Sequence, residues 1–225
     1  MESVMKRLLA GIVLALVVAG CAKSTDDLIK ELNSENPVTR LQAAARLIGQ
    51  KEKGTTGKLA GILESKDERL VFIAAQVLGS RADTLAIEPL GKASKHQNPH
   101  IRARAIWSIG SIGHESGLPY IVAGLQDSIA EVRHSAVSAI GFLHHPESAS
   151  LLYPFLRDEA DSVRAATVKS IFMYCKVPGS GVLAADLALA VNDPSPLVRY
   201  VAVQALGGGF PDSTVAGSLL VEALR

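Results

Sequence analysis

The chain has 225 residues, of which 48% are apolar, enough for one sizeable core or a continuous stack of small ones. Lys and Arg total 23 against 22 for Asp and Glu, so the chain lacks the positive excess typical of proteins that neutralise nucleic-acid phosphates. Aromatic residues make up only 4%, and this composition favours closely packed helices over the β-branched and aromatic surfaces of sheets. We therefore expect an all-α protein that does not bind nucleic acid.

Residues 1–20 have the pattern of a secretory signal. Lys6 and Arg7 form a short positive region, and the apolar stretch that follows is too short to span a bilayer. The stretch ends in Val-Ala-Gly-Cys at residues 18–21, which resembles the lipobox of bacterial lipoproteins, where the cysteine is lipidated and becomes the new N-terminus. We therefore predict a lipoprotein signal peptide and lipidation of Cys21.

The membrane link of the mature protein is then expected to be the lipid. From residue 21 onward the chain has 21 basic and 21 acidic residues, so it offers no net positive charge to a membrane. Lipoproteins retained at the inner membrane usually have Asp after the cysteine, whereas this chain has Ala22. The resemblance therefore implies the periplasmic side of the outer membrane if the host is Gram-negative. Residues 21–25 form a short lipid tether, because the first helix signal comes at Asp26.

From residue 26 to residue 225 the chain repeats itself about every 31 residues. One column of positions is arginine in five of six repeats, and a column three residues later holds small side chains. Mostly apolar columns lie four residues before and four residues after the small one, so these three columns share one face of a helix, which we name helix B. The arginine column is Arg40, Val71, Arg102, Arg133, Arg164 and Arg199. The small-residue column is Ala43, Ala74, Ala105, Ala136, Thr167 and Ala202.

Each repeat contains a second amphipathic segment, which we name helix A. It is marked by Leu28, Leu59, Leu90, Ile121, Leu152 and Leu187. Turn and cap residues precede the B helices and are expected to accept the free N–H groups of the first turn. They are Asn36-Pro37, Asp67-Glu68, Asn98-Pro99, Asp161-Ser162 and Asp193-Pro194. The unit is therefore a helical hairpin, which cannot bury its own apolar stripe and must stack on its neighbours.

The small-residue column allows helix B to approach its neighbours closely, where a larger side chain would overpack the contact. Thr167 is the exception in this column. We expect its hydroxyl to donate to the carbonyl oxygen of Val163 one turn back, with a slightly wider contact in that repeat. After Pro211 the chain is expected to form one last A-type helix.

The pattern is clearest in residues 98–110, which run from Asn-Pro-His-Ile-Arg through Ala-Ile to Ser-Ile-Gly, and again in residues 193–207. It resembles the HEAT-like repeats of the phycobilisome lyase type. The resemblance implies an α-solenoid, a right-handed superhelix of about six HEAT-like hairpins plus a terminal helix. The sequence departs from the family pattern at Ile48, Val71, Thr167 and Phe172. Of these, Ile48 and Phe172 stand where glycine usually closes helix B.

The arginine column is interpreted as structural. These side chains follow closely behind acidic or amide caps. We therefore expect a ladder of bonds from arginine to carboxylates or carbonyls that ties neighbouring repeats together.

Positions one and five residues after the arginine column point away from the small-residue column, so they should lie along one exposed face of the B helices. The resemblance implies that this face lines the concave surface of the solenoid. Exposed aromatic residues on a rigid scaffold are typical of binding hot spots, so Trp107 with its neighbour Arg104 is the best candidate for partner contact. The alternative is that Trp107 fills a gap between repeats. The predicted partner-binding residues are Phe72, Arg104, Trp107, His134, Lys169 and Tyr200.

Metal ligation is a separate hypothesis. Four ligand-type side chains fall after successive B helices, namely His114, His144, His145 and Cys175. With acidic residues nearby a zinc site is conceivable, but repeats packed about 10 Å apart are awkward for direct ligation. We predict no metal site and leave this alternative open. Cys175 is the only cysteine besides the lipidated one, and we expect it to be a small buried apolar residue.

The sequence contains no zinc-peptidase helix motif, no GxSxG elbow and no dinucleotide fingerprint. We therefore predict no catalytic residue, no cofactor and no small-molecule substrate. The leading hypothesis is a membrane-anchored scaffold in the bacterial cell envelope that binds a protein or peptide on the B helices. The alternatives are a chromophore lyase or chaperone, which the resemblance suggests by fold alone, and a metal-binding envelope protein. Export counts against the lyase, because the relatives of that type work inside the cell.

Overall fold

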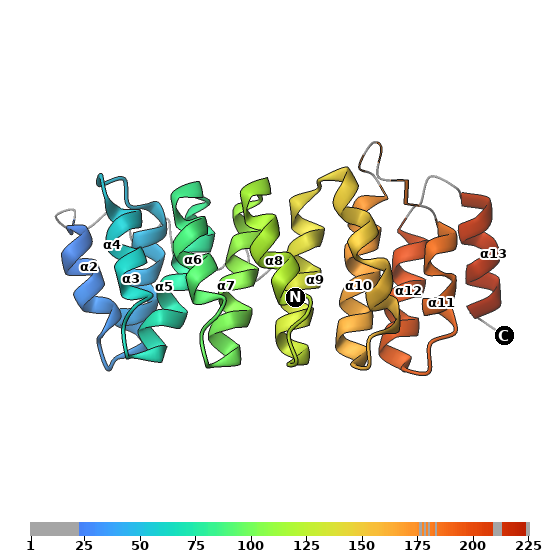
Figure 1. The fold of residues 1–225 in the computed structure, drawn as a ribbon, viewed down its shortest axis with the longest axis horizontal. Helices are drawn as coiled ribbons and strands as arrows, with labels where there is room; N and C mark the ends of the chain where they lie inside the picture. Colours follow the sequence, from blue (N-terminus) through green and yellow to red (C-terminus); the bar gives the residue numbers. More distant parts are fainter. Residues whose placement is uncertain are drawn as a thin grey trace.

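The computed structural model describes residues 23–175, 177, 179, 181, 182, 184–208 and 213–223. All regular elements in these residues are helical, and they follow one another as stacked hairpins from α2 (Thr25–Leu32) to α13 (Ser213–Ala223) (Figure 1). The prediction of an all-α solenoid is therefore confirmed. The last helix begins two residues after Pro211, as expected. Residues 1–20 and Cys21 lie outside the described residues, in which no helix is long and apolar enough to cross a membrane.

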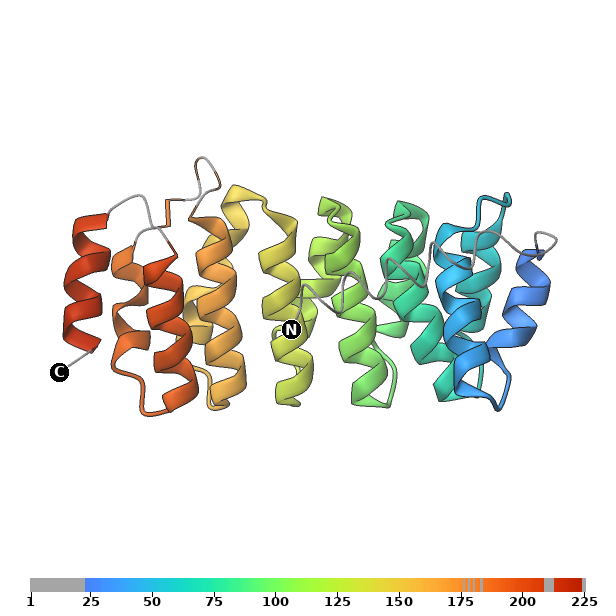
Figure 2. The ribbon, with the colours of Figure 1, turned by 180° about the vertical axis from the view of Figure 1, so that it is seen from behind.

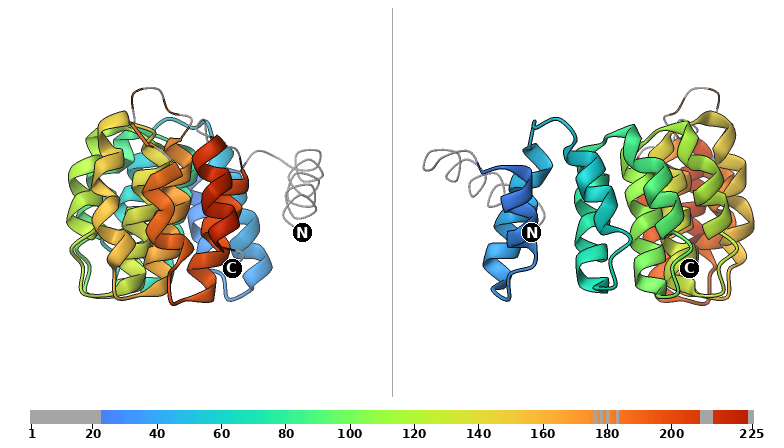
Figure 3. Two further views of the ribbon diagram at one scale, coloured as in Figure 1. Left: turned by 90° about the vertical axis from the view of Figure 1, so that its right-hand side faces the viewer. Right: turned by 60° about the vertical axis from the view of Figure 1, so that its left-hand side comes forward.

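The B helices pack against one another in sequence order and face the viewer in the central part of Figure 2. They are α3 (Pro37–Gly49), α5 (Glu68–Arg81), α7 (Pro99–Ile112), α9 (Ala130–Leu143), α10 (Asp161–Tyr174) and α12 (Pro196–Gly207). The left panel of Figure 3 looks along the stack from the α13 end. Each A element packs on the B helix that follows it, so every hairpin buries its apolar side between the two layers.

The A elements are shorter and less regular than the B helices. They are α2, α4 (Thr55–Ile62), α6 (Ile87–Ala93), α8 (Leu118–Gly124), η3 (Pro146–Leu151) with η4 (Tyr153–Arg157), and η5 (Ala184–Leu187) with α11 (Ala188–Val191). The short 3-10 turns η1 (Thr84–Ala86) and η2 (Glu115–Gly117) precede α6 and α8.

The prediction of an α-helix around Leu152 is wrong, because this segment forms two 3-10 helices. Pro146 and Pro154 each stand in the first turn of one of them. A proline has no N–H to donate and its ring clashes with the preceding turn, so Pro154 cannot lie inside a continuous α-helix. Leu152 is nevertheless fully buried, as its place in the helix A column predicts.

The inward columns form the core as predicted. All six members of the small-residue column have an exposed fraction of 0%. Thr167 is among them, and its hydroxyl donates to the carbonyl oxygen of Val163 at 2.8 Å, so it is buried without an unsatisfied donor. Cys175 is buried as well, with 7% of its surface exposed.

The expected N-caps are confirmed in the early repeats only. The side chains of Asn36, Asp67 and Asn98 each accept a hydrogen bond from the first turn of their helix. In contrast, Asp161 is the first residue of α10, and α12 begins at Pro196, so the caps expected at Asp161 and at Asp193-Pro194 are wrong. Before these two helices the backbone N–H groups of Ala160 and Ser195 donate to the side chains of Asp158 and Asp193.

The N-terminal helix begins at Thr25, one residue before the expected start. Thr25 is fully buried, and its hydroxyl lies 2.8 Å from the hydroxyl of Thr55 at the start of α4. Its backbone N–H donates to the carboxylate of Glu52 at 2.7 Å. The tether before the first helix is therefore shorter than the sequence suggested.

Glycine inside helix B has a different role from the one expected. Gly79, Gly110 and Gly141 do not close their helices but lie within the last turn of α5, α7 and α9. A Cβ atom on Gly110 would lie 2.5 Å from the Cβ of Ala139 in the next B helix. Gly79 faces Ser108 in the same way, at 2.6 Å. Glycine thus permits a backbone approach that no other residue allows.

We expect Gly110→Ala to lower the free energy of unfolding by about 2 kcal/mol, because the added methyl group overpacks the contact between α7 and α9. Gly61→Ala is the matched control, since Gly61 lies in α4 with no atom within 4 Å of a Cβ. That change should be neutral or stabilising by about 0.5–1 kcal/mol. Thermal and urea unfolding followed by circular dichroism measure both effects. Equal effects of the two substitutions would contradict the close approach.

Candidate interaction surface

The arginine column connects consecutive repeats at the loops that lead into the B helices. Arg133 donates from Nε and Nη2 to the two carboxylate oxygens of Asp158, at 2.8 and 2.9 Å. Arg102 pairs in the same two-pronged way with Asp127, and Arg164 with Asp193. We call these three pairs the Arg–Asp ladder. The predicted structural role of the column is confirmed for them.

The remaining guanidinium nitrogen ties each arginine to its own loop. Nη1 of Arg133 donates to the carbonyl oxygens of Asp127 and Ser128, at 2.9 and 3.1 Å. Arg40, Arg102, Arg164 and Arg199 bond the equivalent carbonyls, six and five residues before them. Each ladder arginine therefore holds the loop of its own repeat and binds a carboxylate of the next repeat at the same time.

The column six residues before the arginines was not predicted from the sequence. Its members each accept a hydrogen bond from the backbone N–H two residues later, which sets the loop that starts helix B. The column is Ser34, Ser65, His96, Asp127, Asp158 and Asp193. Its last three members share the spacing of the arginines, and this signal could have revealed the ladder.

The ladder is absent from the first repeats because Ser65 occupies the position that Arg40 would reach. Arg40 accordingly bonds only the carbonyls of its own loop among the described residues. Val71 replaces arginine in the second repeat and is fully buried. There, Arg69 reaches back to Asn33 at 3.2 Å instead.

The ladder carboxylates titrate below their usual range. Burial raises the pKa of Asp158, but hydrogen bonds from Arg133 and from the Ala160 N–H outweigh this effect and leave the pKa lowered. For Asp127 and Asp193 the hydrogen bond from the paired arginine is the largest influence and lowers the pKa. The ladder therefore stays ionised at neutral pH.

The predicted partner-binding residues lie on α5, α7, α9, α10 and α12, and we call the outward face of these helices the B surface. The expectation of one uniformly exposed face is wrong, because adjacent helices come so close that their outward side chains cover one another. Lys169 and Tyr200 are exposed. Phe72, Arg104, Trp107 and His134 are half-buried.

Trp107 and Arg104 are packed against aromatic side chains of neighbouring repeats. The indole of Trp107 meets the ring of Phe142 edge to face, with 4.9 Å between centroids and an angle of 87°. The guanidinium carbon of Arg104 lies 4.5 Å above the ring of Phe72. Trp107 thus bridges two repeats, as the alternative suggested, and still exposes part of its surface.

Electrostatic interactions gather around the same side chains. Burial lowers the pKa of Arg104. Burial also lowers the pKa of His134, and the charge of Lys169 lowers it further. Glu131 lies among them and bonds the Nδ1 atom of His100 at 2.7 Å. The centre of the B surface therefore joins aromatic rings to incompletely compensated positive charge.

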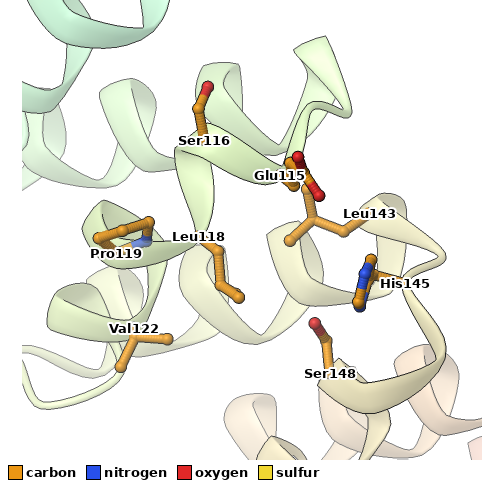
Figure 4. A pocket seen from close by; sticks show the side chains of 8 residues that line it. All are labelled: Glu115, Ser116, Leu118, Pro119, Val122, Leu143, His145 and Ser148. Carbon is orange, nitrogen blue, oxygen red and sulfur yellow. The ribbon is translucent and has the colours of Figure 1, made fainter.

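A shallow cleft of about 560 Å³ lies at the opposite end of the hairpins, between α8 and η3 (Figure 4). It is lined by Glu115, Ser116, Leu118, Pro119, Val122, Leu143, His145 and Ser148. The cleft lies where the regular A helix α8 is followed by a 3-10 segment. The carbon side chains form its walls, and Glu115 and His145 flank its opening.

The ligand-type side chains singled out from the sequence do not converge. Within the described residues no group of three or more His, Cys, Asp or Glu side chains is placed to hold a metal ion. His144 ends α9 in the left-handed conformation with φ of 51°, and His114 Nδ1 accepts the N–H of Ser116. His114 precedes η2 with an extended backbone, whereas His144 closes α9, so the two do not occupy equivalent positions.

The comparisons with known proteins agree with this architecture. Residues 87–171 match the model of HEAT repeats, and residues 5–22 match the prokaryotic membrane lipoprotein lipid attachment site. The chain therefore contains HEAT repeats and a lipoprotein attachment site, which implies a lipid anchor in a membrane. It is related to the uncharacterized phycocyanin operon protein Z of Pseudanabaena tenuis, with 27% identity over 146 residues, which are 63% of this chain and 70% of that protein.

Solved structures confirm the fold. The complex of CpcE and CpcF of phycocyanin lyase from Nostoc sp. matches with a TM-score of 0.59 and 17% identity, over 91% of this chain and 88% of that chain. The protein YibA of Escherichia coli matches with a TM-score of 0.66 and 19% identity, over 89% and 75% of the two chains. At these identities the similarity establishes the fold alone.

Asp158→Asn should lower the free energy of unfolding by about 3 kcal/mol, because it leaves the buried guanidinium of Arg133 with only the exposed carboxylate of Glu159, 3.0 Å away, as a charge partner. The side chains of this pair are only 10% and 7% exposed. Glu88→Gln is the control, since the pair of Glu88 with Lys92 is more than 70% exposed on both sides and should change stability by less than about 0.5 kcal/mol. Chemical unfolding of both variants checks the difference, and similar losses would contradict the ladder's role.

Stability should also depend on pH through the ladder. The folded pKa values of Asp127, Asp158 and Asp193 lie below the unfolded value of about 3.9. Their contribution is therefore complete above about pH 4 and is lost as the pH falls through the folded pKa. We expect the melting temperature to drop below about pH 4, and to drop less in Asp158→Asn. A pH series of thermal melts measures this, and parallel curves for the two proteins would contradict it.

Proposed function

We propose that this lipoprotein is a scaffold that holds a protein or peptide partner on its B surface. The observation that carries the proposal is the half-exposed group of Phe72, Arg104 and Trp107 on the outside of adjacent B helices. These are residue types that dominate binding energy at protein interfaces, and packing against neighbouring repeats holds them in place before a partner arrives. The inward columns are fully used by the core, so this outer face is what the fold offers to a partner.

The proposed location is the periplasmic side of the outer membrane in a Gram-negative host. It is supported by the lipid attachment match and by Ala22, which stands where lipoproteins of the inner membrane usually have Asp. The first helix begins at Thr25, so the lipid on Cys21 keeps the solenoid close to the bilayer.

We propose a binding role and no catalysis. The carboxylates with lowered pKa in the Arg–Asp ladder are hydrogen-bonded on both oxygens by arginine, which suits them to structure better than to proton transfer.

A second candidate is a chromophore lyase or chaperone. It is favoured by the relation to the phycocyanin operon protein and by the fold shared with the lyase subunits CpcE and CpcF. The lipid attachment site counts against it, because export separates this chain from a chromophore-protein synthesised inside the cell. The absence of any absorbance change on mixing with a free bilin would end this candidate.

Capture from native membranes tests the scaffold. Crosslinking and affinity purification of the wild-type protein should recover a reproducible partner, and Trp107→Ala should lose it while keeping the helical circular dichroism. Cys21→Ala should move the protein from the membrane to the soluble fraction without affecting the B surface. Ser111→Ala, an exposed change one turn from Trp107, is the surface control. A partner retained by Trp107→Ala would count against the B surface as the binding site.

A further inference from the structure

Arg104 is held in place with a hydrogen-bond donor unused. Its guanidinium carbon lies 4.5 Å from the centroid of the Phe72 ring, and this contact holds the group in place. Its Nε atom is buried and has no hydrogen-bond partner among the described residues. A planar guanidinium already oriented in this way matches the geometry of a carboxylate, which accepts two parallel N–H bonds.

The charges around Arg104 are unbalanced. Glu131 on α9 is the anion that acts on Arg104, and one of its carboxylate oxygens lies 2.7 Å from Nδ1 of His100. Lys169 on α10 adds a second permanent positive charge, close enough to lower the pKa of His134 between them. This part of the B surface therefore favours a further negative charge from outside.

The side chain of Trp107 offers an apolar contact next to the positively charged Arg104. Trp107 lies three residues after Arg104 in α7, so the two side chains share one helix face. The indole is backed by Phe142 and remains partly exposed. A ligand that reaches Arg104 with a carboxylate can therefore rest an apolar side chain on Trp107.

We propose that the partner segment is an acidic peptide, in which an aspartate or glutamate carboxylate pairs with Arg104 and a neighbouring apolar side chain packs on Trp107. This inference rests on the proposed function of the B surface and adds the chemical class of the segment that this surface binds. The carboxylate accepts N–H groups of the terminal guanidinium nitrogens of Arg104, which unlike Nε are not buried, and lies within the field of Lys169. The aromatic contact supplies buried area beside the ion pair, where water is excluded.

Trp107 is the chain's only tryptophan, so its fluorescence can report peptide binding at this site. We would titrate the purified protein in detergent with a capped peptide of alternating glutamate and leucine, and with the matched peptide of glutamine and leucine, and follow the emission of Trp107. The glutamate peptide should bind at least about tenfold more tightly, as expected for charge-assisted hydrogen bonds. Arg104→Gln should abolish this preference. Arg157→Gln, the same change at an exposed site in η4, should retain it.

Lys169→Gln gives a second test that does not depend on buried packing, because Lys169 is exposed. It should weaken only the glutamate peptide, by a few fold. Equal binding of the two peptides, an unchanged preference in Arg104→Gln, or no binding of either peptide would overturn the acidic-peptide assignment. Binding to Trp107→Ala is measured by calorimetry, because this variant contains no tryptophan. Equal binding of the two peptides that is lost in this variant would overturn the acidic-peptide assignment while supporting the scaffold. Membrane capture independent of Trp107 would count against the scaffold itself.

Discussion

The close approach of successive B helices is the constraint on which the rest of the structure depends. It requires glycine at Gly79 and Gly110, where the neighbouring B helix leaves no room for a Cβ atom. The small-residue column is fully buried as well, and the hydroxyl of its one larger member, Thr167, is satisfied within its own helix. Because the helices are this close, outward side chains from different repeats touch, and Phe72 meets Arg104 while Trp107 meets Phe142. The candidate interaction surface is thus a result of the core packing.

The Arg–Asp ladder adds specificity to this non-directional packing. Apolar stripes alone allow neighbouring hairpins to slide or rotate, whereas a guanidinium with two parallel bonds to one carboxylate admits one arrangement. The pairs occupy the interfaces that begin at Arg102, Arg133 and Arg164, which lie beside the aromatic and cationic groups of the B surface. The most precisely fixed repeats therefore include those that carry the proposed binding residues.

The sequence predicted those features that follow from periodicity. The buried columns, the hairpin unit and the hydroxyl bond of Thr167 depend on spacing along a helix, and a 31-residue repeat shows spacing directly. The 3-10 segments around Leu152 were not predicted, because the apolar pattern continues there. Only Pro154 indicates that the segment is not a continuous α-helix. The glycine contacts and the partner carboxylate of Arg133 were missed for another reason. Both are contacts between two repeats. A column of equivalent positions shows which residues share a place within their own repeats, but it does not show which residue of the next repeat each of them contacts.

The ladder runs along only one long edge of the solenoid, at the loops that enter the B helices. At the opposite edge the hairpins join through left-handed helix ends such as His144, and the cleft between α8 and η3 opens there. Other bonds join the repeats at this edge, where Arg81 donates to the carbonyl oxygens of Leu47 and Gln50 and Tyr174 donates to that of Ile140. The two long edges of the stack are thus held by different chemistry: carboxylates that acid can neutralise on one side, and peptide carbonyls that keep their bonds in acid on the other.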